Sequence, residues 1–273
     1  MKSLFQLLAL LCAASAMFAQ QPEILSRRAN AFVFQEGYSV TFDGVDEYIA
    51  CADHDDFSFT DGSGNDAPFS LFIWMNRATA STNQTLISKY GQGREEYILT
   101  LIGSSIRIIC LTSITHYIGR SAPLSTTGTW IGIAMTYDGS ESSTGLKLYS
   151  VTASGAVTQI DNGNLNNGSY TGMGNKQAAF RVGAYDHEST WYFDGKLAFP
   201  LIADKALSVA ELTEAAIVPN GDYRNVSFCD NIISAWFFEN GTTDYPTYTD
   251  YKSGRNGTLT NMQESNISID KPE

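Results

Sequence analysis

The chain has 273 residues and a formal net charge of −12 at pH 7, from 17 Lys and Arg against 29 Asp and Glu. Such an acidic chain has no basic stripe to displace counterions from phosphates, so nucleic acid and anionic membranes are not expected as partners. Aromatic residues make up 12% and there are 23 Gly, a profile typical of many short strands joined by tight turns.

The first 19 residues have the pattern of a secretory signal. Lys2 precedes an apolar run from Leu4 to Phe18, and Ala14-Ser15-Ala16 and Ala19 offer cleavage sites. The run is short for a transmembrane helix, so we expect no membrane insertion of the mature chain. The alternative is a retained hydrophobic arm that packs into a partner. Residues 20–35 are predicted to be a polar linker, and the protein is expected to be secreted.

The first predicted strand begins at Tyr38, where apolar residues alternate as far as Phe42. Asp43-Gly44 follows, and Asp-Gly supplies the positive φ that a tight turn needs. A second short strand is predicted from Tyr48. A related pattern recurs in Tyr192–Leu197.

Further strands are predicted along the middle of the chain. Phe69–Met75 is apolar on both faces, as in a central strand. The other predicted strands are 85–89, 96–102, 105–111, 129–137, 146–149, 179–184 and 196–201. Their spacing indicates two packed antiparallel sheets. Trp74, Trp130 and Trp236 lie in predicted strands and are expected in the core, as is the thiol of Cys110.

One helix is predicted after these strands. Ser208 and Glu211 have the spacing of a capping box, with Ser208 at the N-cap and Glu211 at N3. Residues 217–273 are too few for a sound core of their own. They contain one further predicted strand at Ile232–Phe238, and we expect the segment to pack back on the preceding domain.

Three motifs resemble those of laminin-G-like domains in the concanavalin A-like lectin/glucanase family. They are Phe42-Asp43-Gly44 with Asp46 and Tyr48, Phe193-Asp194-Gly195-Lys196-Leu197, and Ala206-Leu207-Ser208 with Glu211-Leu212. The resemblance implies an all-β fold for residues 36–216, a two-sheet antiparallel β-sandwich of the jelly-roll type with one short helix. The run from Trp236 to Met262 resembles the tail that follows such domains in phage virion proteins and bacterial surface proteins.

The residues argue against catalysis. Glucanases of this family carry Glu-x-Asp-x-Glu on one strand, which points the carboxylates into one cleft. That triplet is absent here, and Glu95 and Glu96 are adjacent, so they would face opposite sides of a strand. The chain also lacks a Gly-x-Ser-x-Gly nucleophile motif and a paired histidine spacing for zinc. We therefore expect a protein that is not an enzyme.

Calcium is the metal that the sequence favours. Asp-rich turns provide the carboxylate and carbonyl oxygens that calcium takes, and relatives often hold a calcium ion at one rim of the sandwich. The candidate ligands are Asp43, Asp46 and Asp186. The alternative role for an Asp before Gly is turn formation alone.

The candidate ligand-binding segment joins two predicted strands between Ala184 and Tyr192. It holds Tyr185, Asp186, His187, Glu188 and Trp191, so aromatic faces could stack on a sugar while carboxylates bind its hydroxyls. The alternative is that Trp191 packs beneath the loop and caps the sandwich. Tyr90 and Tyr117, near other predicted loops, are the next candidates.

The sequence thus favours a non-catalytic extracellular recognition or adhesion protein that binds a glycan or another surface polymer. The alternatives are a phage virion protein, such as a fibre or decoration component that uses the fold for contacts with other subunits, and a glycan hydrolase.

Overall fold

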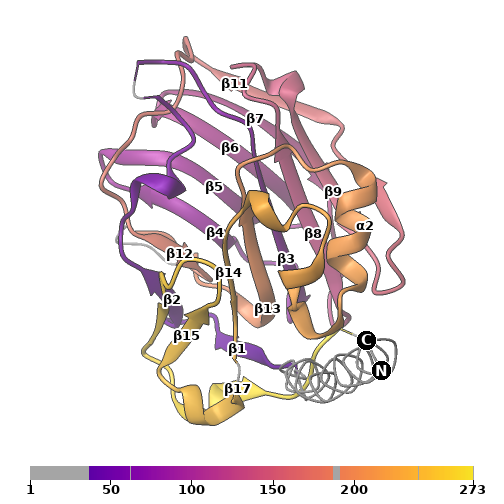
Figure 1. Cartoon of the computed structure of the whole chain (residues 1–273). Helices are drawn as coiled ribbons and strands as arrows, with labels where there is room; N and C mark the ends of the chain where they lie inside the picture. Colours follow the sequence, from indigo (N-terminus) through magenta and orange to yellow (C-terminus); the bar gives the residue numbers. More distant parts are fainter. Residues whose placement is uncertain (1–36, 62, 187–190, 239, 273) are drawn as a thin grey trace, which may run out of the picture. The chain divides into compact units, whose positions relative to one another are not determined.

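The computed structural model describes residues 37–61, 63–186, 191–238 and 240–272. The predicted signal peptide or arm at 1–19 and the linker at 20–35 lie outside the described residues. The described part folds as two antiparallel β-sheets with one α-helix, which confirms the predicted all-β sandwich (Figure 1). Among the described residues, no helix combines the length and apolarity needed to cross a membrane.

The first sheet has the strand order β17–β1–β13–β3–β8–β9–β10. Its strands are β17 (Ile267–Ser268), β1 (Ser39–Asp43), β13 (Asp194–Ala203), β3 (Phe69–Arg77), β8 (Ile131–Tyr137), β9 (Leu146–Val151) and β10 (Val157–Gln159). The two Asp-Gly motifs of the sequence meet here, because Asp43 of β1 pairs with Asp194 of β13.

The second sheet has the order β15–β16–β2–β12–β4–β5–β6–β7–β11. Its strands are β15 (Thr247–Asp250), β16 (Gly257–Thr260), β2 (Tyr48–Cys51), β12 (Phe180–Val182), β4 (Gln84–Gly91), β5 (Arg94–Ile102), β6 (Ser105–Ser113), β7 (His116–Pro123) and β11 (Gly163–Asn167). Figure 1 shows β4 to β7 side by side in this layer. Strand β14 (Ile232–Phe237) pairs with β13 of the first sheet and with β15 of the second.

The core lies between the two sheets. Strand β3 contributes Phe69, Leu71 and Ile73, all fully buried, and its second face is buried as well. This confirms the prediction that β3 is a central strand, since β13 and β8 flank it on both sides. Cys110 is also buried in the core, as predicted.

The helix α2 (Val209–Ile217) begins where the capping box predicts. The Ser208 side chain accepts from the Glu211 N–H, and the Glu211 carboxylate accepts from the Ser208 N–H at 2.8 Å. Its buried residues are Leu212, Ala215 and Ala216. A local motif at i, i+3 spacing therefore marks where this helix begins.

One tryptophan prediction is wrong. Trp74 and Trp236 are buried in strands, but Trp130 precedes β8 and is partly exposed. Its indole N–H donates to the Asp270 carboxylate at 3.0 Å, so a polar contact near the C-terminus takes the place of burial.

Residues after α2 contribute to both sheets. Strand β16 pairs with β2, and β17 pairs with β1. Trp236 of β14 is buried and stacks on Phe180, with ring centroids 5.1 Å apart and an interplanar angle of 11°. The cysteines Cys51, Cys110 and Cys229 form no disulfide.

Candidate ligand-binding site

A pocket of about 190 Å³ lies on the face of the second sheet that points away from the core. Its 11 lining residues come from β4, β5, β6, β7, the turn after β6, and the segment after β12. They are Tyr90, Ile98, Thr100, Ile102, Arg107, Ile109, Leu111, Ile114, Tyr117, Tyr185 and Trp191.

The floor of the pocket follows from strand alternation. On β5, Leu99 and Leu101 point into the core, so Ile98, Thr100 and Ile102 point out. On β6, Ile106 and Ile108 are in the core while Arg107 and Ile109 face the pocket. A face that would ordinarily be polar is therefore mostly apolar here, which is typical of a binding surface.

One wall is the segment between β12 and β13, which runs along the edge of β4. The Gly183 N–H donates to the Leu86 carbonyl at 3.0 Å, and the Asp186 N–H donates to the Tyr90 carbonyl at 2.9 Å. The Thr85 N–H donates to the Trp191 carbonyl at 2.9 Å. Hydrogen bonds to β4 therefore position the described residues on both sides of residues 187–190.

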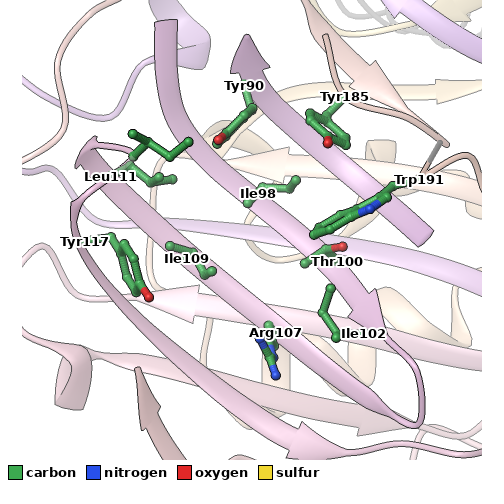
Figure 2. Close-up of a pocket in the computed structure, with 11 residues that line it drawn as sticks. Tyr90, Ile98, Thr100, Ile102, Arg107, Ile109, Leu111, Tyr117, Tyr185 and Trp191 are labelled. Carbon is green, nitrogen blue, oxygen red and sulfur yellow. The ribbon is translucent and has the colours of Figure 1, made fainter. Parts of the chain in front are cut away.

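The aromatic side chains form a connected group on this wall. The ring of Tyr185 contacts Tyr90 edge-on at 5.4 Å between centroids, and Trp191 at 5.5 Å. Figure 2 shows Tyr117 and Trp191 at opposite sides of the pocket, with Ile109 and Thr100 between them. All four aromatic residues are partly exposed, so their rings are accessible to a ligand.

Asp186 is held between two arginines. Its carboxylate bonds Arg94 at 2.8 Å and Arg181 at 2.9 Å, and Arg181 also donates to the Tyr185 carbonyl at 3.4 Å. Asp186 therefore anchors the residue that precedes it, Tyr185, beside β4. His187 and Glu188, predicted in the same site, lie outside the described residues.

The hydroxyl of Tyr90 has an altered acidity. Burial raises the pKa of Tyr90 to about 12, helped by the negative charge of Glu95 and by Tyr185. A tyrosine is neutral at physiological pH even with its ordinary pKa, and the raised pKa keeps the Tyr90 hydroxyl protonated in more alkaline solution as well.

Of the two other predicted calcium ligands, Asp43 ends β1 and Asp46 lies in the turn between β1 and β2. The Asp43 carboxylate accepts from the Val45 N–H at 2.8 Å, which is ordinary turn chemistry. Asp46 is exposed in the same turn, and its carbonyl accepts from Asn261 at 3.2 Å. Within the described ranges, no three His, Cys, Asp or Glu side chains gather as a metal site.

Four aromatic residues that the sequence placed in two separate candidate regions line a single pocket: Tyr90, Tyr117, Tyr185 and Trp191. The residues missed by sequence analysis are those on β5 and β6, including Arg107. The sequence did contain a signal that could have pointed to Arg107 as a site residue. Arg107 is the single charged residue in the otherwise apolar run 106–111.

The chain was compared with known families and proteins. The family model described as the concanavalin A-like lectin/glucanases superfamily matches residues 43–213. Comparison with curated proteins gives no match.

Three solved structures are similar to this chain at low sequence identity. A protein of Bacteroides ovatus with a proposed role in carbohydrate binding has a TM-score of 0.57 and 18% identity, over 87% of this chain and 61% of that chain. The CBM40 domain of a Ruminococcus gnavus sialidase, bound to α2,3-sialyllactose, has a TM-score of 0.44 and 13% identity, over 65% of this chain and 97% of that one. A pentraxin of Limulus polyphemus has a TM-score of 0.43 and 12% identity, over 77% of this chain and 94% of that one.

At 18% identity the Bacteroides ovatus structure shows the fold alone, and this chain spans 61% of that chain. The family assignment comes from the match over 43–213, which is more than half of the chain. With its two antiparallel sheets and its lectin-like fold, the chain belongs to the concanavalin A-like lectin/glucanases superfamily.

Proposed function

We propose that this protein is a non-catalytic carbohydrate-binding protein that acts outside the producing cell and binds its ligand in the pocket on the second sheet. The observation that carries the proposal is the convergence of Tyr90, Tyr117, Tyr185 and Trp191 on one open, largely apolar pocket. Flat aromatic faces pack against the C–H faces of sugar rings, and nearby polar groups bind the hydroxyls.

The size of the pocket supports recognition of a small part of a larger ligand. Its volume of about 190 Å³ is below the ~300–1,000 Å³ that is common for pockets enclosing a whole small molecule. A terminal sugar or one unit of a polymer would occupy it, and the rest of the glycan would extend over the sheet.

The composition of the lining supports binding without hydrolysis. A glycosidase needs two carboxylates that flank the scissile bond. The described lining residues include neither Asp nor Glu, and the nearby Asp186 is bound to two arginines. We therefore expect no release of reducing ends from β-glucans, agars or carrageenans.

The test is glycan binding by aromatic variants. Trp191→Ala and Tyr117→Ala remove rings from opposite sides of the pocket, and each should weaken binding by about 2 kcal/mol, roughly thirtyfold in Kd. Glycan-array screening followed by calorimetry on the best ligand measures this. Trp130→Ala is the matched control, because it removes a partly exposed indole that does not line the pocket.

Two outcomes would reject the proposal. One is unchanged binding by both pocket variants in folded protein, as judged by circular dichroism. The other is the absence of glycan binding together with stable self-assembly, which would favour the virion alternative.

A bound calcium ion is a further proposal, with Asp43 and Asp46 as its nearest pair of predicted carboxylates. A ligand that binds only the folded state raises the melting temperature, so millimolar calcium should raise it and a chelator should lower it. Equal melting temperatures under both conditions would reject calcium binding.

A further inference from the structure

Among the described residues that line the pocket, Arg107 is the one with a charged side chain. It lies in β6, directly opposite Thr100 of β5 and Ser121 of β7. Figure 2 shows its side chain at the edge of the aromatic and aliphatic group. A cation at this position stands out in a chain whose net charge is −12.

Its neighbours show how arginines are usually accommodated in this sheet. Arg120 of β7 binds the Asp161 carboxylate at 2.8 Å through Nε. Arg94 and Arg181 both bind Asp186. Each of these three guanidinium groups therefore has a carboxylate partner within the chain.

Arg107 differs from them. Within the described ranges no carboxylate forms an ion pair with its guanidinium group, and its Nε is buried without an acceptor although the residue as a whole is partly exposed. A buried polar group without a partner is destabilising, and more so when it is charged. A site that tolerates this cost in the free protein is expected to recover it when a ligand supplies the missing acceptor.

A guanidinium group is well suited to one kind of acceptor. Its planar fork of N–H donors matches the paired oxygens of a carboxylate or a sulfate. The other described lining residues are neutral, so that contact would be only weakly screened. A neutral sugar would leave the charge without a counter-ion.

We propose that the pocket selects glycans with an acidic substituent, a carboxylate or a sulfate ester, and that Arg107 binds this group while the sugar ring packs against Tyr117 and Trp191. The proposal rests on the proposed function and adds the class of ligand and the residue that determines specificity.

The experiment compares ligands that differ only in the acidic group. An array would carry carboxylated oligosaccharides beside their methyl esters, and sulfated oligosaccharides beside the desulfated forms. The wild-type protein should bind one acidic member at least about tenfold more tightly than its neutral counterpart, as expected for hydrogen bonds to charged groups. The two sets of pairs distinguish carboxylate from sulfate.

Variants then connect the preference to the residue. Arg107→Gln should remove the preference for the acidic member, and Arg107→Lys should keep part of it, because it retains the charge but loses the fork. Arg224→Gln is the matched control, since Arg224 forms an exposed pair with Asp222 and does not line the pocket. Added salt should weaken binding of the acidic member more than binding of the neutral one.

The outcomes separate this inference from the proposed function. Equal binding of acidic and neutral members, lost in Trp191→Ala, would overturn the inference and keep carbohydrate binding. A preference that survives in Arg107→Gln would also overturn the inference. No binding to any member would overturn both proposals.

Discussion

Single charged side chains position the pocket wall. Asp186 illustrates this, since its carboxylate joins Arg94 of β5 and Arg181 of β12 beside the aromatic group. The sequence identified Asp186 as a residue of this segment and assigned it to ligand or metal binding. Its two arginine partners could not be predicted, because they lie 92 and 5 positions away in sequence and meet it only through sheet pairing.

We predict that Asp186→Asn weakens glycan binding more than it lowers stability. The pairs are partly exposed, with 28% of the Asp186 side chain accessible, so their loss should cost about 1 kcal/mol of unfolding free energy or less. Loosening of Tyr185 and Trp191 should raise Kd by several-fold. Chemical denaturation and calorimetry measure the two effects. Asp222→Asn, at an exposed pair outside the pocket, is the control, and the prediction fails if the two variants bind alike.

At the scale of elements, long apolar strands and local capping motifs were predictable, and short polar strands were not. Strand β3 and the capping box of α2 follow from residues close in sequence. Strand β11 has the sequence Gly-Asn-Leu-Asn-Asn, which carries no strand periodicity. It forms because its backbone pairs with the open edge of β7, a partner more than 40 residues away.

The turn between β10 and β11 links the two sheets through Asp161. Its fully buried carboxylate accepts from Arg120 of β7 at 2.8 Å and from the Leu148 N–H of β9 at 2.9 Å. Burial by itself would raise the pKa of Asp161, but the Leu148 hydrogen bond and Arg120 together hold it below its usual value. One side chain therefore ties β7 of the second sheet to β9 of the first.

We predict that Asp161→Asn lowers the unfolding free energy at pH 7 by about 3 kcal/mol, because Arg120 is left without its counter-ion. A carboxyl with a lowered folded-state pKa stabilises the fold above its unfolded pKa, and this is lost as pH falls through the folded value. The difference between wild type and variant should therefore be full at pH 7 and shrink below about pH 4. Urea titrations across this range measure it. A difference that does not change with pH would contradict the ionic role.

At the scale of the whole described chain, the sandwich includes strands that lie beyond the residues matched by the family model. The family model ends at residue 213, yet β14 to β17 come after it and pair with strands of both sheets. The sequence predicted a segment that packs back, and it identified the strand at Ile232–Phe238. The pairings of the later strands were not predictable, because β16 and β17 are four and two residues long.

We predict that a chain ending at residue 216 does not form a stable sandwich. The deletion removes Trp236, which packs against Phe180 and Phe57 with ring centroids 5.1 and 6.0 Å away, and it exposes the edges of β1 and β2. Replacing the indole alone, in Trp236→Ala, should cost about 3–5 kcal/mol, so losing all four strands should exceed the stability of an ordinary domain. Near-UV circular dichroism and thermal melting compare the truncated chain with one ending at Lys271, which keeps every strand. A cooperative melt in the shorter chain would show that residues 36–216 fold alone and that the C-terminal strands are an addition to a complete core.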